Sequence, residues 1–205
     1  RVQCYSEKRI TFLIMGDICT RNCLYCGVSS GHPASIDPDE INHISGLVKE
    51  LQSTYLVITS VTRDDLPDYG AGYFSSVVKA IKQCQPSCKV EVLVPDFMGK
   101  TGLVKKVLEA GPYVFSHNIE VVKSLFSHLR PGGEYSRSLV ILAAAKKMNA
   151  FTKSGLMLGF GETTDQIYAT CRDLRDVGVD ALTLGQYLPP GKGTPPVYKY
   201  YSPAE

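Results

Sequence analysis

The sequence lacks three features that often assign a protein to a broad class. It has no excess of charge of one sign, since 22 lysines and arginines stand against 20 acidic residues, and no basic run or stripe is present. No apolar stretch approaches the length of about 20 residues that a membrane-spanning helix needs. No secretory signal is visible. These absences argue against nucleic-acid binding, membrane insertion and secretion.

The chain length and the cysteine count narrow the remaining classes. With 205 residues, of which 44% are hydrophobic, the chain is long enough for one sizeable core and short for two, so we expect a single domain. Seven cysteines are an odd total, which suits a reducing compartment better than a disulfide-bonded secreted protein. We therefore expect a cytoplasmic protein, or one of an organelle matrix if a targeting peptide preceding Arg1 has been removed.

Three cysteines crowd into one short loop after an apolar run at 11–15. Cys19, Cys23 and Cys26 have the spacing C-x3-C-x2-C. Their thiolates can converge only if the backbone curls around a common centre, which a loop leaving a strand permits. Zinc sites and ferredoxin-type clusters draw four protein ligands, whereas three ligands leave one iron of a 4Fe-4S cluster open to a small molecule. The alternative is a set of structural or disulfide cysteines, although three is an odd number for pairing.

Apolar periodicity predicts alternating strands and helices along the whole chain. Strands are expected at 11–16, 55–59, 89–94, 114–118, 151–158 and 181–184, and helices at 37–51, 73–83, 101–110, 120–125, 136–148 and 164–177. Residues 1–10 read as an irregular lead-in, 11–188 as the main domain and 189–205 as a tail rich in Pro, Gly and Tyr. Six βα repeats predict an α/β fold with a partial (β/α)6 barrel of TIM type, whose working face lies at the carboxyl ends of the strands. A doubly wound open sheet is the alternative.

Several segments besides the cysteine loop resemble one known family. They are FLIMGDI at 12–18, SVTRDDL at 60–66, VPDF at 94–97, FSHNIE at 115–120, RPG at 130–132 and TKSGLM at 152–157. Together with the aromatic residue before the last cysteine, this ordered series resembles the lipoyl synthases, which are radical S-adenosylmethionine (SAM) enzymes. The resemblance runs from Cys4 to about Tyr187.

The resemblance implies a fold, a reaction and partners. It implies a radical SAM partial barrel in which Cys19, Cys23 and Cys26 hold a 4Fe-4S cluster whose open iron binds SAM. Reductive cleavage of SAM then gives a 5'-deoxyadenosyl radical, which removes hydrogen from carbons 6 and 8 of a protein-bound octanoyl group, and sulfur inserted there makes the lipoyl cofactor. The implied partners are an octanoylated carrier, either a 2-oxoacid dehydrogenase subunit or the glycine cleavage H protein, and an electron donor such as ferredoxin or flavodoxin.

Residues near the first two strands are candidates for binding SAM. We expect Tyr25 to pack beside the adenine or the cluster, although an aromatic residue in a loop also simply covers apolar surface. Thr62, Arg63 and Asp64 follow the second strand, where charged groups suit the methionine ammonium and nearby polar atoms. A solvated surface turn is the rival interpretation of these charges.

A second set of candidates lies near the fourth strand and beyond. Asn118 and Glu120 are expected to accept hydrogen bonds from ribose hydroxyls, although an acidic residue at a helix N-terminus is a serious rival for Glu120. Arg137 is the candidate for a bidentate contact to the SAM carboxylate, with Arg130 as the alternative, and helix-surface salt bridges are the rival for both. Gln186 completes the set at the end of the sixth strand.

Cys4 and Lys153 are two further candidates for a functional role. The resemblance implies that Cys4 is the last cysteine of a C-x4-C-x5-C motif that binds a second, auxiliary 4Fe-4S cluster, the sulfur donor; a free surface thiol is the alternative. The two other cysteines and a C-terminal serine of that site are not in this sequence, so we expect this segment alone to cleave SAM without forming lipoyl product. Lys153 lies within an expected strand, where its ammonium must reach water, a partner or a ligand.

Two rival functions stay open from the sequence alone. One is another radical SAM sulfur-inserting enzyme, either of the biotin synthase type or one half of a two-protein lipoyl synthase. The other is a metal-binding scaffold without catalysis. Iron and sulfide content, together with release of 5'-deoxyadenosine from SAM, separates these possibilities.

Overall fold

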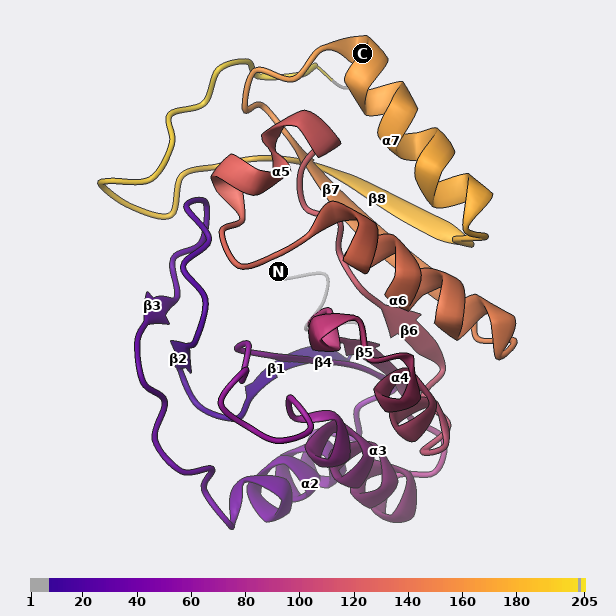
Figure 1. The fold of residues 1–205 in the computed structure, drawn as a ribbon. Coiled ribbons are helices and arrows are strands. Elements are labelled where there is room, and N and C mark those ends of the chain that lie inside the picture. Colours follow the sequence, from indigo (N-terminus) through magenta and orange to yellow (C-terminus); the bar gives the residue numbers. More distant parts are fainter. Residues whose placement is uncertain (1–7, 203) are drawn as a thin grey trace.

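A curved sheet of six parallel strands organises the chain (Figure 1). The computed structural model describes residues 8–202, 204 and 205. The strands are β1 (Arg9–Ile14), β4 (Tyr55–Ser60), β5 (Lys89–Leu93), β6 (Val114–Ser116), β7 (Thr152–Leu158) and β8 (Ala181–Gln186). Their order in the sheet is the same as their order in the chain, and every neighbouring pair is parallel. A doubly wound sheet would reverse its order at a switch point, so the partial barrel is confirmed.

Helices connect successive strands and lie outside the curve of the sheet (Figure 1). They are α2 (Glu40–Glu50), α3 (Ala71–Cys84), α4 (Thr101–Leu108), α5 (Lys123–Leu129), α6 (Tyr135–Lys147) and α7 (Thr164–Asp176), with a 3-10 turn η1 (Phe97–Gly99) before α4. Two short strands, β2 (Ile18–Cys19) and β3 (Ser29–Ser30), pair with each other within the loop that carries the cysteines. That small ladder shapes a segment for which the sequence predicted only a loop.

Two predicted boundaries are wrong. The first strand begins at Arg9, which pairs with Tyr55, so the lead-in expected at 1–10 overlaps the sheet. The short helix expected at 120–125 is α5, which begins at Lys123. Glu120 instead forms a β-bridge with Leu156 and has a φ of 68°, a left-handed conformation that interrupts a right-handed helix. Glu120 is therefore not an acidic residue in the first turn of that helix.

The apolar core lies between the sheet and the helices, in two clusters. One cluster packs β1, β4 and β5 against α2, α3 and α4, and includes Val48, Ile58 and Phe74. The other packs the β7 side of the sheet against α5, α6 and α7, and includes Phe126 and Leu174. Because successive side chains of a strand point to opposite faces, burying one face against helices leaves the other facing the barrel interior. The described part of the chain has no helix long and apolar enough to cross a membrane.

The described part of the tail after β8 returns to the end of the barrel. The Tyr187 hydroxyl donates to the carbonyl of Pro195 over 3.0 Å. The Tyr198 amide donates to the carbonyl of Gly159 over 2.7 Å. The predicted division at residue 189 therefore separates two segments that share hydrogen bonds.

Candidate active site

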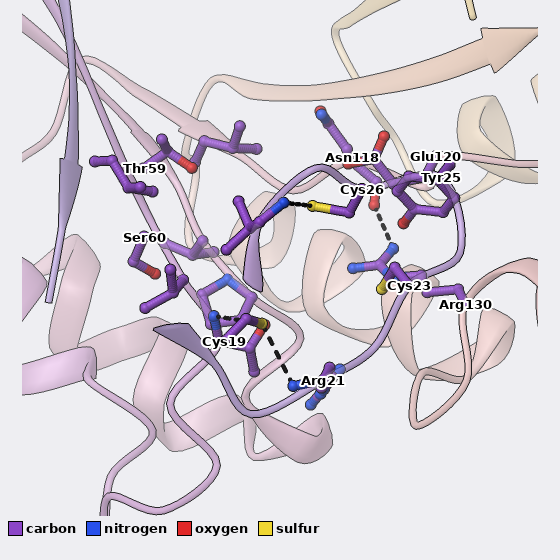
Figure 2. Close-up of a pocket in the computed structure, with 17 residues that line it drawn as sticks. Cys19, Arg21, Cys23, Tyr25, Cys26, Thr59, Ser60, Asn118, Glu120 and Arg130 are labelled. Carbon is purple, nitrogen blue, oxygen red and sulfur yellow. Dashed lines mark hydrogen bonds between the residues drawn. The ribbon is translucent and has the colours of Figure 1, made fainter. Parts of the chain in front are cut away.

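A cavity lies at the carboxyl ends of the strands, on the face where the fold predicts a working site (Figure 2). Its walls come from the loop after β1, the ends of β4 and β5, and the segment after β6. The polar and sulfur-bearing residues that line it are Cys19, Arg21, Cys23, Tyr25, Cys26, Thr59, Ser60, Thr62, Asn118, Glu120 and Arg130. All three cysteines of the loop therefore share one cavity with a carboxylate, a carboxamide and two guanidinium groups.

Backbone amides donate to two of the three sulfur atoms. The Sγ of Cys19 accepts from the amides of Arg21 at 3.4 Å and Thr62 at 3.3 Å. The Sγ of Cys26 accepts from the amide of Val28 at 3.4 Å. Hydrogen bonds of this kind to cysteine sulfur are also a feature of iron–sulfur sites, where they tune the cluster.

The third sulfur lies beside a cation. Burial raises the pKa of the Cys23 thiol, whereas the Arg130 guanidinium lowers it and so favours the thiolate. Among the described residues, no three side chains of the Cys, His, Asp and Glu types converge on one point suitable for a single metal ion. A 4Fe-4S cluster does not require that convergence, because each thiolate binds a different iron. The donor set therefore fits a cluster better than a single zinc ion.

The cysteine loop is anchored to the strand ends around it. The amide and the hydroxyl of Thr20 both donate to the carbonyl of Thr62 over 3.0 Å. The Thr20 hydroxyl also accepts from the amide of Asp64 at 3.1 Å. At the other end of the loop, the Gly31 amide donates to the carbonyl of Cys19 over 2.9 Å. Residues between the first two cysteines are thus fixed relative to β4.

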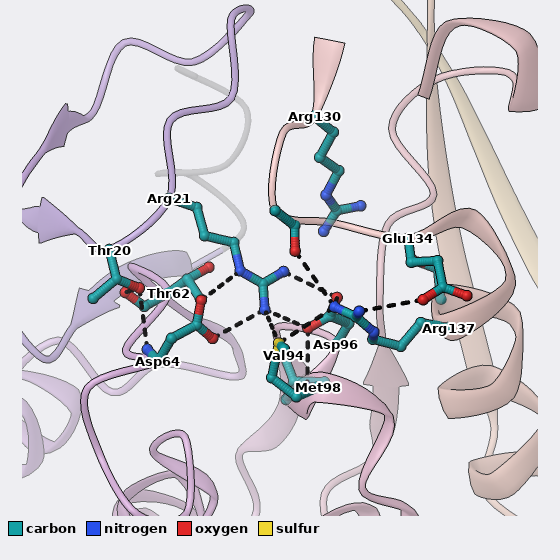
Figure 3. Close-up of polar contacts among 12 residues, drawn as sticks. Thr20, Arg21, Thr62, Asp64, Val94, Asp96, Met98, Arg130, Glu134 and Arg137 are labelled. Atoms are coloured by element: carbon teal, nitrogen blue, oxygen red, sulfur yellow. Dashed lines mark hydrogen bonds and ion pairs between the residues drawn. The ribbon is translucent and has the colours of Figure 1, made fainter. Parts of the chain in front are cut away.

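Arg21 makes the strongest of these anchors (Figure 3). Its guanidinium contacts Asp64 at 2.7 and 3.0 Å and Asp96 at 2.9 and 2.6 Å, a bidentate pair on each side. Arg137 contacts the same Asp96 carboxylate at 3.2 Å. The side chains of Arg21 and Asp96 are 4% and 1% exposed, so these charges depend on each other rather than on water. The network joins the loop to β4, β5 and α6.

The opposite wall of the cavity carries groups suited to a polar ligand. Arg130 donates through Nη1 to the carbonyl of Asn118 over 2.8 Å, and Glu120 lies beside them (Figure 2). Burial raises the pKa of Glu120, while Arg130 and the Asn118 side chain lower it. The Tyr25 ring packs at 6.2 Å from the ring of Phe160, which stacks on Tyr187 at 4.1 Å. An apolar, aromatic wall thus adjoins a charged one.

Comparison with known proteins decides the family. Residues 13–174 match the radical SAM superfamily. The chain is 48% identical over 203 residues to the lipoyl synthase of Caldicellulosiruptor saccharolyticus, covering 98% of this chain and 71% of that protein. Lipoyl synthase 2 of Gloeobacter violaceus is also 48% identical, over 207 residues that make up 100% of this chain and 72% of that protein. The chain belongs to the lipoyl synthase family. The resemblance inferred from the sequence is confirmed.

A solved structure supports the fold of this family member. Streptococcus suis SuiB bound to S-adenosylmethionine superposes with a TM-score of 0.75 over 97% of this chain and 46% of that chain. The two sequences are only 11% identical, so this likeness establishes the fold and nothing more.

Half of the predicted SAM ligands of this lipoyl synthase homologue line the cavity. Tyr25, Thr62, Asn118 and Glu120 do so together with the three cysteines, and Thr62 contributes its backbone amide. Cys4, the predicted ligand of an auxiliary cluster, lies outside the described residues. The role of each of these residues stays a prediction.

The other four predicted SAM ligands do not line this cavity. They are Arg63, Asp64, Arg137 and Gln186. Arg63 turns away, to Asp65 at 2.8 Å and the carbonyl of Met15 at 3.0 Å. Asp64 binds Arg21, and Arg137 binds Asp96 and Glu134. The side-chain Nε2 of Gln186 donates to the backbone carbonyls of Leu158, Tyr187 and Lys199 at 3.0 to 3.2 Å and so holds the tail in place. Arg130, the predicted alternative to Arg137, is the arginine on the cavity wall opposite Arg21.

Arg21 and Asp96 hold the site together, but the sequence alone indicated no role for either residue. The available signal was their position, because Arg21 lies between two predicted metal ligands and Asp96 directly follows a buried strand. Neither position indicated that the two side chains pair across 75 residues of sequence.

Proposed function

We propose that this chain carries out the SAM-cleaving, hydrogen-abstracting part of lipoyl synthase chemistry, the insertion of two sulfur atoms at carbons 6 and 8 of a protein-bound octanoyl group, and that sulfur insertion additionally requires the auxiliary cluster. The observation that carries the proposal is the single cavity in which the thiols of Cys19, Cys23 and Cys26 adjoin Glu120 and Arg130. Family membership makes that cavity the natural place for the cofactors of a radical SAM enzyme.

The residues of the cavity have separable roles in this proposal. The three cysteines hold a 4Fe-4S cluster, which when bound supplies the electron that cleaves SAM to methionine and a 5'-deoxyadenosyl radical. Arg130 and Glu120 bind the charged and hydroxyl-bearing parts of SAM, and Tyr25, with the Phe160 ring packed behind it, supplies apolar surface beside the adenine. Arg21 acts indirectly, since its ion pairs hold the loop while its amide donates to Cys19.

The finer features of the reaction are part of the proposal. The sulfur atoms would come from an auxiliary 4Fe-4S cluster with Cys4 among its ligands. The octanoyl group would be carried by a 2-oxoacid dehydrogenase subunit or a glycine cleavage H protein, and electrons would come from ferredoxin or flavodoxin in the cytoplasm or an organelle matrix. We also propose that residues 11–188 form the catalytic unit, flanked by the lead-in and the tail.

Anaerobic reconstitution with iron and sulfide tests the proposal. The parent chain is expected to bind a 4Fe-4S cluster and to release 5'-deoxyadenosine from SAM under reductant. Replacement of Cys19, Cys23 and Cys26 by alanine should abolish both, because the cluster loses every protein ligand in this loop. The matched control replaces Cys84, Cys88 and Cys171, which lie outside the cavity, and should keep both properties. Release of 5'-deoxyadenosine at the parent rate by the first variant would overturn the assignment.

Substrate chemistry is tested by mass spectrometry of an octanoyl-lysyl peptide incubated with the reconstituted protein. Hydrogen loss from the octanoyl chain, accompanied by sulfur when the auxiliary cluster is present, supports lipoyl synthesis. Zinc binding without SAM cleavage would instead favour the non-catalytic scaffold.

A further inference from the structure

A second cavity continues from the first one into the barrel. It shares Leu93, Asn118 and Glu120 with the cysteine-lined cavity and has a volume of about 270 Å³. Its other lining residues come from the strands of the sheet and are Val57, Glu91, Ser116, Lys153, Gly155, Leu156, Met157, Thr183 and Gly185. The two cavities are therefore adjacent.

An ion pair lies near the amino ends of the strands that line this cavity. The Nζ of Lys153 lies 2.9 Å from Oε1 of Glu91, and the Tyr55 hydroxyl donates to Oε2 of Glu91 over 2.6 Å. These three side chains join β7, β5 and β4 across the lumen. The Glu91 side chain is 4% exposed, so the pair cannot open without leaving a charge that water does not solvate. This contact accounts for the lysine that the sequence places within a strand.

The side chains between the ion pair and the cysteine-lined cavity are largely apolar. Val57, Leu93 and Met157 supply aliphatic and thioether surface. Two inner-face positions are glycines. A Cβ at Gly185 would meet no atom within 4 Å, so it would project into open space, whereas a Cβ at Gly155 would lie 2.8 Å from Oδ1 of Asn118. The apolar side chains suit an unbranched acyl chain, and a larger side chain at the exposed position 185 would occupy part of this space.

We propose that the Glu91–Lys153 pair, with Tyr55 behind it, is a polar stop that limits the length of acyl chain the barrel accepts, and that Gly185 leaves room for that chain. The inference rests on the proposed function, because it assigns specificity determinants to the acyl substrate of that reaction. An aliphatic chain gains free energy from the apolar walls but cannot replace the hydrogen bonds of a buried ion pair. Each methylene that would extend past the ion pair should therefore lower the affinity for the acyl chain about ten-fold.

Acyl-lysyl peptides that differ only in chain length test the proposal. Perdeuterated hexanoyl, octanoyl, decanoyl and dodecanoyl peptides are incubated with the reconstituted protein, SAM and reductant, and deuterium in the released 5'-deoxyadenosine is measured. The parent is expected to transfer deuterium best from the octanoyl chain and to fall about ten-fold or more with the longer chains. The double variant Glu91→Leu/Lys153→Met removes both charges together and should raise transfer from the decanoyl and dodecanoyl chains.

A second variant keeps the test valid if the double variant does not fold. Gly185→Leu should reduce deuterium transfer from the octanoyl chain about ten-fold or more relative to the hexanoyl chain. Leu184→Val is the matched control, because residue 184 is 51% exposed on the opposite face of the same strand, and it should match the parent.

The outcomes separate this inference from the proposed function. If the parent releases no 5'-deoxyadenosine, or transfers no deuterium from any acyl chain, the proposed function and this inference both fail. If the parent transfers deuterium but Gly185→Leu and a folded double variant keep its chain-length profile, only the inference fails. A shift of that profile toward longer chains in the double variant, or its loss in Gly185→Leu alone, supports it.

Discussion

Two buried charge networks in this protein use similar residues in different surroundings. The first, Arg21 with Asp64, Asp96 and Arg137, lies beneath the cysteine loop, and protein atoms satisfy both of its carboxylates. The second, Glu91 with Lys153 and Tyr55, lies in the barrel lumen and borders a cavity. Arg21 is 4% exposed at its side chain, whereas Lys153 is 33% exposed. Arg21 also lines the cysteine cavity and Asp64 is 28% exposed, so the two networks differ in degree. We call the first network closed because a guanidinium faces each of its carboxylates, and the second network open because its lysine borders a cavity.

The two networks show how charged groups that stabilise the fold differ from charged groups that a ligand can contact. In the closed network each acidic group already has its cation. In the open network, and on the wall formed by Arg130 and Glu120, charged groups border empty space. A charged residue at the carboxyl end of a strand is therefore a ligand candidate only if its neighbours leave it unsatisfied.

Breaking the closed network should have the largest effect on stability. Arg21→Met leaves Asp64 and Asp96 without their shared cation, and we expect a loss of about 3 to 5 kcal/mol in the free energy of unfolding. Lys153→Met is the matched change in the open network and should cost less, about 1 to 3 kcal/mol, because Tyr55 still donates to the buried Glu91 carboxylate and Lys153 itself is 33% exposed. Urea denaturation of the metal-free proteins measures both. Equal losses would mean that exposure to the lumen does not distinguish the two networks.

The second prediction concerns which arginine binds SAM. Arg130→Ala should weaken SAM binding by about 1.5 to 3 kcal/mol, or roughly ten-fold to a hundred-fold, because it removes a charged donor from the cavity wall. Arg137→Ala should leave the affinity within about two-fold, since Arg137 is engaged by Asp96 and Glu134. Isothermal titration of reconstituted proteins with matched iron content compares them. The opposite ranking would return the carboxylate contact to Arg137.

The sequence predicted the barrel well because its signals are local. Apolar runs and helix-ending residues located every main strand and helix. The start of β1 was placed too late, and a left-handed residue at Glu120 shifts the start of α5. The cysteine spacing and the family segments located the loop that lines the cavity.

The contacts of individual side chains were harder to predict, because they join residues that are distant in the sequence. Arg63 and Asp64 are adjacent in sequence yet bind different partners, Asp65 and Arg21. Arg137 and Arg130 looked equivalent as helix-flanking arginines, and only the position of Asp96 separates them. The pairing of Glu91 with Lys153 joins strands 62 residues apart, and no local pattern predicts it.

The smallest expected effect is a pH dependence that arises within the closed network. Burial would raise the pKa of Asp96, but hydrogen bonds and charge from Arg21 lower it from 3.8 to about 2. A carboxyl group whose pKa is lowered by folding stabilises the protein fully above its unfolded pKa. That contribution, roughly 2 kcal/mol, should be lost as the pH falls from about 4 through 2.

Urea denaturation of the metal-free protein, repeated at several pH values from about 5 to about 2, measures this loss of stability. Lowered pKa values of Asp65, Asp68 and Asp180 add to the slope in the same window, so the parent must be compared with variants. Asp96→Asn should flatten the profile by the Asp96 contribution, whereas Asp176→Asn, at a side chain 69% exposed, should leave it unchanged. If both variants kept the parent slope, the charge of Asp96 would not be stabilised by Arg21, and the closed network would lose its distinction from the open one.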